Sequence, residues 1–181
     1  MVTVKINGQE IDIATEWHEV TLAQYREMER VADELNSVRI LSILSGIDYD
    51  VLINFDCSQF DEKVLQYLAF MSDVPSWTEL PKPEYLTIEG VQYKVPERIE
   101  STTWFQRTMM KTLATEGVTN SLRMTQLIAP AITYMMQPVL EEGKVSDKHY
   151  PSIQQKIDKL PITDVYPVAS FFLSTYLTYS R

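Results

Sequence analysis

Alternating aliphatic and polar residues open the chain and predict a β-hairpin. Aliphatic side chains occupy every second position on both sides of Asn7-Gly8, at Val2, Val4, Ile6, Ile11 and Ile13. A period of two places all of them on one face of a two-stranded ribbon. The Asn-Gly pair supplies the positive φ values that a type I′ turn requires.

Three helical segments are predicted after this hairpin. The pattern Thr21-Leu22-Ala23-Gln24 is a capping box, so a helix should run over residues 22–35, where apolar positions recur at helical spacing. A second helix starts near Asn36 and ends at Gly46, the residue that best adopts a left-handed conformation. A third helix is expected over 58–71, after a short turn at 48–53.

The second part of the chain repeats this order of elements. Pro75, Pro81 and Pro83 indicate an extended linker, because the residue before a proline is disfavoured in a helix. A second hairpin is expected around Glu89-Gly90. Helices should follow from Ser101 or Thr102 to 115 and over 119–140, 147–159 and 163–179. Inside the second of these, Pro130 should kink or split the helix.

The two hairpins and the helices after them match at a constant offset of 82 residues. The matched pairs are Ile6 with Ile88, Gly8 with Gly90, Thr21 with Thr103, Gln24 with Gln106 and Met28 with Met110. Glycine turns and threonine caps are common, so coincidence is one interpretation. A structural duplication is the other, and we favour it because the matches fall on turn and cap positions.

These elements predict an α+β fold that is mostly helical. The hairpins either remain separate or join into one antiparallel sheet, and joining is economical because an isolated hairpin is marginally stable. The expected organisation is a hairpin with an acidic helical unit over 1–75, a linker over 76–84, and a hairpin with a Met- and aromatic-rich helical unit over 85–181. The units either stand apart or pack as one domain.

Charge excludes several classes of partner. The 181 residues carry a formal charge of -9, and no cluster of Lys and Arg forms a basic face, so we expect no binding to nucleic acid or to anionic lipid. No apolar run approaches the roughly 20 residues of a membrane span. The polar start MVTVKINGQE is neither a signal nor a transit peptide, which predicts a protein made in a cytoplasm.

The sequence contains no pattern that predicts catalysis, a cofactor or a metal site. Cys57, His18 and His149 are too few and too scattered for a zinc site, and glycine motifs of nucleotide enzymes are absent. Asp48 and Asp50 begin like a calcium loop that then fails, so we interpret them as helix caps. The acidic pairs 33–34, 61–62 and 141–142 are typical of solvated surface.

A protein interface is expected in the C-terminal half. Residues 1–100 hold 8 Lys and Arg against 19 Asp and Glu, whereas residues 101–181 hold 8 against 6. Helices of this nearly neutral half are apolar on more than one face, which is typical either of a central helix or of an oligomer surface. The candidate interface residues are Trp104, Phe105, Met135, Met136, Phe171, Phe172 and Tyr176. We therefore expect an uncovered apolar stripe on 119–140 or 163–179, and a homo-oligomer.

Part of the chain resembles small proteins from the structural gene clusters of tailed bacteriophages. The similar segments are the first hairpin through residues 17–25 (WHEVTLAQY), residues 40–46 (ILSILSG) and residues 68–71 (LAFM). In that family a short hairpin precedes a Trp-x-x-(Val/Ile)-Thr-Leu-x-x-(Tyr/Phe) helix start. The family includes virion components and tail-assembly factors of phages that infect Bacteroidetes, crAss-like phages among them. The resemblance covers roughly the first 75 residues.

The resemblance implies a structural or assembly role without catalytic residues. We expect a non-enzymatic virion protein of the connector or tail region that contacts other virion proteins. A tail-assembly chaperone that binds another phage protein transiently is the first alternative, and an uncharacterised hydrolase is the second.

Overall fold

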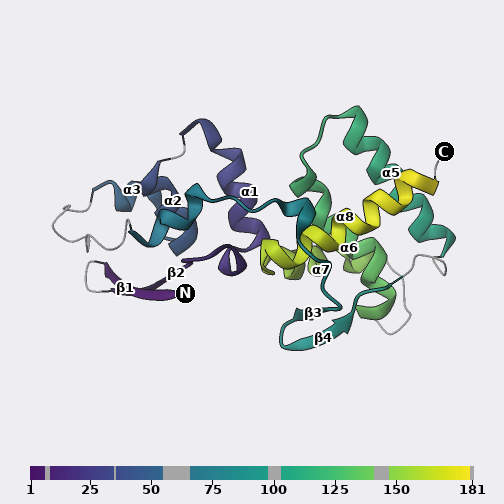
Figure 1. Ribbon diagram of the computed structural model, residues 1–181, viewed down its shortest axis with the longest axis horizontal. Helices are drawn as coiled ribbons and strands as arrows, with labels where there is room; N and C mark the ends of the chain where they lie inside the picture. The colour runs from purple at the N-terminus through teal and green to yellow at the C-terminus, as the bar shows by residue number, and fades with distance from the viewer. Residues whose placement is uncertain (7–8, 35, 55–65, 98–102, 141–146, 180–181) are drawn as a thin grey trace. The chain divides into compact units, whose positions relative to one another are not determined.

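The computed structural model describes the chain except residues 7–8, 35, 55–65, 98–102, 141–146 and 180–181. The chain divides into two compact units, unit 1 over Met1–Pro75 and unit 2 over Ser76–Arg181. Each unit contains one two-stranded antiparallel sheet and several helices (Figure 1). The fold is therefore α+β and predominantly helical, as predicted. The two hairpins form separate sheets, so of the two alternatives left open by the sequence the joint sheet is not formed.

Unit 1 begins with the predicted hairpin. Strands β1 (Val2–Ile6) and β2 (Gln9–Ile13) pair so that Val2 faces Ile13 and Val4 faces Ile11. Val4 and Ile13 are buried on the inner face. The predicted turn residues Asn7 and Gly8 lie outside the described residues.

The described helices of unit 1 have the capping residues that the sequence predicts. They are α1 (Leu22–Arg30), α2 (Ser37–Ser45) and α3 (Tyr49–Leu52), with 3-10 turns η1 (Trp17–Glu19), η2 (Ala32–Glu34) and η4 (Leu68–Ser72). The predicted capping box of α1 is present, Asn36 caps α2 by accepting from the Arg39 N–H at 2.9 Å, and Asp48 caps α3. Helix α2 ends at Gly46, which has φ +73°. The helix expected over 22–35 stops at Arg30, and most of the helix expected over 58–71 lies outside the described residues.

Trp17 joins the first and last segments of unit 1. Its indole Nε1 donates a hydrogen bond to the Asp73 carbonyl at 2.8 Å. Its ring packs edge-on against Tyr25 and Phe70, with centroid distances of 5.9 and 5.3 Å. Such edge-to-face pairs add stability beyond the burial of apolar area. Unit 1 is thus closed around an aromatic cluster contributed by three separate segments.

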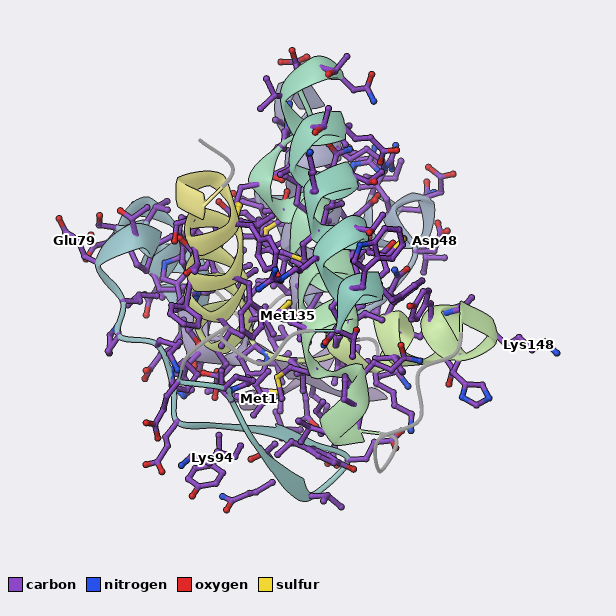
Figure 2. The ribbon with its side chains drawn as sticks, turned by 90° about the vertical axis from the view of Figure 1, so that its right-hand side faces the viewer. Met1, Asp48, Glu79, Lys94, Met135 and Lys148 are labelled. Atoms are coloured by element: carbon purple, nitrogen blue, oxygen red, sulfur yellow. The ribbon has the colours of Figure 1, made fainter. Side chains whose placement is uncertain are left out.

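Unit 2 is built around one central helix. Its elements are η5 (Trp77–Glu79), β3 (Tyr85–Ile88), β4 (Val91–Lys94), α5 (Trp104–Thr119), α6 (Met124–Leu140), η6 (Asp147–His149), α7 (Tyr150–Asp158) and α8 (Ile162–Tyr179). Helix α6 packs against α5, α7 and α8. Figure 2 shows Met135 between α8 and the green helices, in the interior of the unit. An apolar surface all round α6 is therefore explained by neighbours within the unit.

The packing of unit 2 bears on two expectations about its helices and its linker. Helix α6 runs unbroken through Pro130 and Pro138, so of the two alternatives for Pro130, a kink or a split, the split is excluded. Residues 76–84 are not a free linker, because η5 packs on α8, where the Trp77 and Tyr166 rings lie 5.9 Å apart. Lys82 in the same segment places its Nζ 4.9 Å from the centre of the Phe171 ring.

The 82-residue repeat of the sequence is also a repeat of structure. Pairing of Val4 with Ile11 corresponds to pairing of Leu86 with Tyr93, and the strands keep this register along their length. The second hairpin turns at Glu89 and Gly90, whose φ values of 52° and 82° suit the type I′ turn. Buried positions coincide as well: Val4 and Leu86, Ile13 and Val95, Met28 and Met110, Val31 and Leu113.

The capping boxes of α1 and α5 repeat bond for bond. In α1, the Gln24 Oε1 accepts from the Thr21 N–H at 2.9 Å, and the Gln24 N–H donates to the Thr21 hydroxyl at 3.2 Å. In α5, Gln106 and Thr103 make the same two bonds at 2.9 and 3.2 Å. The register, the buried positions and the caps thus agree with duplication rather than coincidence.

Each cap glutamine also reaches a neighbouring helix. Gln24 Nε2 donates to the Ile43 and Leu44 carbonyls at 3.4 and 3.1 Å, in the last turn of α2, where carbonyls lack a helical donor. Gln106 Nε2 donates to the Tyr134 and Met135 carbonyls at 3.0 and 3.2 Å. The two repeats therefore use one side chain both to start a helix and to hold a second helix against it.

In unit 2 the carbonyls that accept from Gln106 lie inside α6, and Pro138 in the same helix explains why one of them needs a donor from outside the helix. A helical carbonyl normally accepts from the N–H four residues later, and the residue four after Tyr134 is Pro138, which has no N–H. The Tyr134 carbonyl would be left without a helical donor. Gln106, which is only 4% exposed, supplies the missing donor.

Candidate functional site

The outward side of α5 is the most prominent apolar exposure in unit 2. Trp104 is the first residue of this helix and its side chain is 82% exposed, while Val118 near the other end is 74% exposed. Residues at spacings of three and four share one side of a helix. We call this side the α5 face, made of Trp104, Arg107, Thr108, Lys111, Thr115 and Val118.

Threonines make the middle of the α5 face less polar than its sequence suggests. The Thr108 hydroxyl donates to the Trp104 carbonyl at 3.0 Å, and the Thr115 hydroxyl donates to the Lys111 carbonyl at 2.9 Å. These bonds satisfy the hydroxyl protons within the helix itself. The α5 face therefore has one exposed apolar residue near each end, and the cationic groups of Arg107 and Lys111 lie between them.

The duplicated structure shows what is unusual about Trp104. Its counterpart 82 residues earlier is Leu22, which is 0% exposed. The two positions have the same place in the same capping box, yet one side chain is buried and the other lies in solvent. Trp is large and amphipathic, and such exposed aromatic residues commonly anchor protein contacts.

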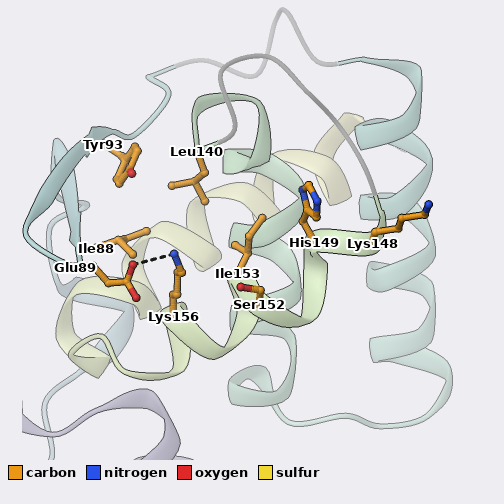
Figure 3. A pocket seen from close by; sticks show the side chains of 9 residues that line it. All are labelled: Ile88, Glu89, Tyr93, Leu140, Lys148, His149, Ser152, Ile153 and Lys156. Atoms are coloured by element: carbon orange, nitrogen blue, oxygen red, sulfur yellow. Dashed lines mark ion pairs between the residues drawn. The ribbon is translucent and has the colours of Figure 1, made fainter.

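A second feature of unit 2 is a cleft of about 200 Å³ between the β3–β4 hairpin and α7. Figure 3 shows that the hairpin supplies one wall and that α7 with η6 supplies the other. The lining residues are Ile88, Glu89, Tyr93, Leu140, Lys148, His149, Ser152, Ile153 and Lys156.

An ion pair crosses this cleft. The Lys156 Nζ lies 2.8 Å from a Glu89 carboxylate oxygen, and both side chains are substantially exposed. The hydrogen bond from Lys156 lowers the pKa of Glu89, and the same bond raises the pKa of Lys156. The pair thus ties the hairpin turn to α7 and is weakened by solvent.

The cleft does not assemble a recognisable catalytic geometry. Ser152 and His149 both line it, but Figure 3 shows the serine hydroxyl and the histidine ring pointing in different directions. A serine nucleophile needs its base within hydrogen-bond reach. The ion pair of Glu89 and Lys156 therefore acts as a structural tie in this conformation.

The predicted interface residues separate into two groups. Met135, Met136, Phe172 and Tyr176 are buried in the core of unit 2, which contradicts their assignment to a surface. The reason is that α8 packs on α5, α6 and η5, and these contacts cover the stripe that we expected to be free. The half-buried Phe105 stacks on Tyr150 at 6.2 Å, and the half-buried Phe171 lies below Lys82. Only Trp104 of the seven is largely exposed.

Other exposed apolar residues were missed by the sequence reasoning. They include Val118 on α5 and, in unit 1, Val51 and Ile53 at α3. The spacing of Trp104 and Val118, which are fourteen residues apart on one helix, is a signal that could have identified the α5 face.

Residues considered for metal or acid–base chemistry are dispersed. The His18 ring lies 3.2 Å from the Glu16 carboxylate on an exposed 3-10 turn, and Asp48 serves as the predicted helix cap. Cys57 and the acidic pairs 61–62 and 141–142 lie outside the described residues. In the part of the chain that the structure describes, no three His, Cys, Asp or Glu residues gather as a metal cluster. Within the same residues, no helix combines the length and the apolar character needed to cross a membrane.

Comparisons with protein-family models, with curated proteins and with solved structures found no match to this chain.

Proposed function

We propose that the chain is a non-enzymatic structural protein of a tailed-bacteriophage particle, in its connector or tail region, that acts through contacts with other virion proteins. The observation that carries this proposal is the α5 face with its exposed Trp104. An indole exposed to water does not gain the favourable free energy of burying its apolar surface, and a contact with another protein would provide that gain.

The organisation of the chain supports a role in assembly. Two hairpin–helix repeats, each with its own buried core, present two separate surfaces from one polypeptide. Unit 1 carries 5 Lys and Arg against 14 Asp and Glu, whereas unit 2 carries 11 of each. One unit is therefore strongly acidic and the other is neutral, which suits a protein whose two units contact different neighbours.

The resemblance of residues 17–25 to phage structural proteins supports the particle as the setting. Under this proposal the protein is made in the host cytoplasm and is then incorporated into the virion. The partners are other virion proteins and further copies of the chain.

Mass spectrometry of purified particles, with copy number, tests the proposal. A structural component should be present at a fixed number of copies per particle. Detection in assembly intermediates but not in finished particles would instead identify an assembly chaperone. Absence from both would refute a role in the particle.

A pair of variants connects this result to the α5 face. Trp104→Ala should reduce incorporation into particles by about tenfold or more, as expected for an interface anchor. Val139→Ala is the matched control, because Val139 is an apolar residue with 42% exposure outside the face. Equal incorporation of both variants would contradict the assignment of the α5 face.

A further inference from the structure

We propose that copies of this chain associate head to tail, with the α5 face of one copy binding a corner of unit 1 on the next copy. We call this second surface the α3 corner, made of Asp48, Asp50, Val51 and Ile53. The inference deepens the proposed function by naming the partner of the α5 face, and it rests on that function.

The α3 corner combines exposed apolar and exposed acidic side chains. Val51 and Ile53 are 47% and 50% exposed, while Leu52 between them is buried and anchors the turn. The Asp48 carboxylate accepts from the Asp50 N–H at 2.8 Å, which caps the short helix. The two aliphatic side chains are therefore held in place beside two exposed carboxylates.

The α5 face and the α3 corner are complementary in chemistry. The face offers Trp104 and Val118 as apolar contacts and Lys111 as a cation. The corner offers two exposed aliphatic residues and two carboxylates. Burial of the apolar residues would favour association, and opposite charge would set its orientation and speed.

Segregation of charge between the units disfavours a symmetric contact between two copies of unit 1 and favours a contact that joins unit 1 to the α5 face. Two copies of unit 1 would bring together surfaces that each carry a formal charge of about -9, because unit 2 is neutral overall. A contact between unit 1 and the α5 face brings carboxylates to a lysine instead. Contacts between two different patches produce either a closed ring or an open filament.

Sedimentation velocity of the purified full chain measures this association directly. The average mass should rise above 20.9 kDa as the concentration increases through the micromolar range, and the rise should diminish in high salt. Trp104→Ala should weaken the association by about tenfold or more. A chain that stays monomeric to about 100 μM, which is weaker than specific interfaces of standard size usually bind, would overturn the proposal.

Charge reversal identifies the two patches. Lys111→Asp and Asp50→Lys should each weaken self-association, because each places like charges across the contact. An equimolar mixture of the two variants should recover self-association as an assembly in which the variants alternate. In that assembly the new aspartate of one variant faces the new lysine of the other, and the unchanged Lys111 faces the unchanged Asp50 at the next contact. Lys159→Asp is the matched control, because it reverses an exposed lysine outside the α5 face and should leave association unchanged.

The mixing experiment distinguishes this contact from other occupants of the α5 face. Failure of the mixture to form a complex, while the circular dichroism of both variants matches the parent, would overturn the proposal. Monomeric behaviour combined with Trp104-dependent incorporation into particles would assign the face to a different virion protein and would also overturn it. Self-association of a chain that is absent from particles would refute the proposed function alone.

Discussion

The hydrogen bonds of Gln106 give the sharpest prediction about stability. Its side chain completes the cap of α5 and donates to the Tyr134 carbonyl, which Pro138 leaves without a helical donor. Gln106→Ala removes the cap partner, at a cost of about 1 kcal/mol. It also removes the donor to the half-buried Tyr134 carbonyl and to the buried Met135 carbonyl, at a further cost of about 1–3 kcal/mol. The expected total is about 2–4 kcal/mol, a large part of the stability of a domain of this size.

A double-mutant cycle with Pro138→Ala isolates the bond to Tyr134. Alanine at this position provides the N–H that the Tyr134 carbonyl lacks, so the carbonyl keeps a partner when Gln106 is replaced. Gln106→Ala should therefore cost about 1 kcal/mol less in the Pro138→Ala background than in the parent. The cap contribution is the same in both backgrounds and cancels.

Pro130→Ala is the matched control for this cycle. Pro130 is also inside α6, but the carbonyl that it deprives belongs to the exposed Gln126 one turn earlier. Gln106→Ala should cost the same with or without Pro130→Ala. Equilibrium urea unfolding followed by circular dichroism gives the free energies, and hydrogen exchange of the α5 and α6 amides assigns the loss to unit 2.

A coupling free energy between Gln106 and Pro138 below about 0.3 kcal/mol, the usual error of additivity, would refute the claim that Gln106 replaces the donor that Pro138 lacks. Equal coupling to Pro130 would also refute it, because the effect would then follow from a general change in helix stability. A cost of Gln106→Ala near zero would show that water replaces the glutamine amide.

Three further predictions concern single residues. Gly46→Ala should destabilise unit 1 by about 1 kcal/mol in urea unfolding, because Gly46 has a left-handed φ of +73° that a residue with a Cβ adopts only under strain. No atom lies where the added methyl group would be, so the cost reports backbone strain alone. An unchanged unfolding midpoint would contradict this explanation. Trp17→Phe should cost about 1 kcal/mol through loss of the bond to the Asp73 carbonyl, and faster amide exchange at both ends of unit 1 should accompany it. Lys156→Ala should raise the pKa of Glu89 toward its ordinary value of 4.5, measured by NMR titration of the carboxyl group. Because the pKa of Glu89 is lowered in the folded parent, the ion pair favours the folded state above pH 4.5, and this contribution is lost as the pH falls through the lowered pKa. An identical titration of Glu89 in the variant would contradict this assignment.

Local chemistry explains which parts of the fold could be predicted. Three kinds of feature depend only on residues within one turn of each other. They are the turn at Glu89-Gly90, the cap threonines of α1 and α5, and the end of α2 at Gly46. Their conformations follow from φ preferences and from hydrogen bonds within a few residues, which a sequence displays directly.

Burial of the apolar helices could not be predicted in the same way. An apolar surface all round a helix is compatible with a central position or with an oligomer contact, and the choice depends on how many other elements pack on it. Met135 and Phe172 were therefore assigned to a surface although α6 and α8 are core helices. Trp104 is exposed, as an interface residue must be, but its role in an interface stays a prediction. Its position at the start of α5 does not by itself explain the exposure, because Leu22 at the same position of α1 is buried.

The hydrogen bonds from the cap glutamines to a neighbouring helix could not be predicted from the local sequence either. Gln106 contacts a carbonyl 28 residues away, and the need for that contact arises from Pro138 in another helix. Nothing in the pattern Thr-x-x-Gln indicates which helix lies beside the cap. The candidate interaction site has the same limitation, since the α5 face is defined by what α6 and α8 leave uncovered.

The order of elements in unit 2 has a consequence for synthesis. Helix α8 contacts α5, α6 and η5, yet it follows all of them along the chain. Unit 1 has every one of its contacts available once residue 75 has been translated, so it can fold while the ribosome adds the rest at roughly 5–20 residues per second. The side of α6 that packs on α8 stays uncovered for several seconds until α8 has been synthesised. During that interval the acidic unit 1 can already be folded, and its charge repels neighbouring nascent chains.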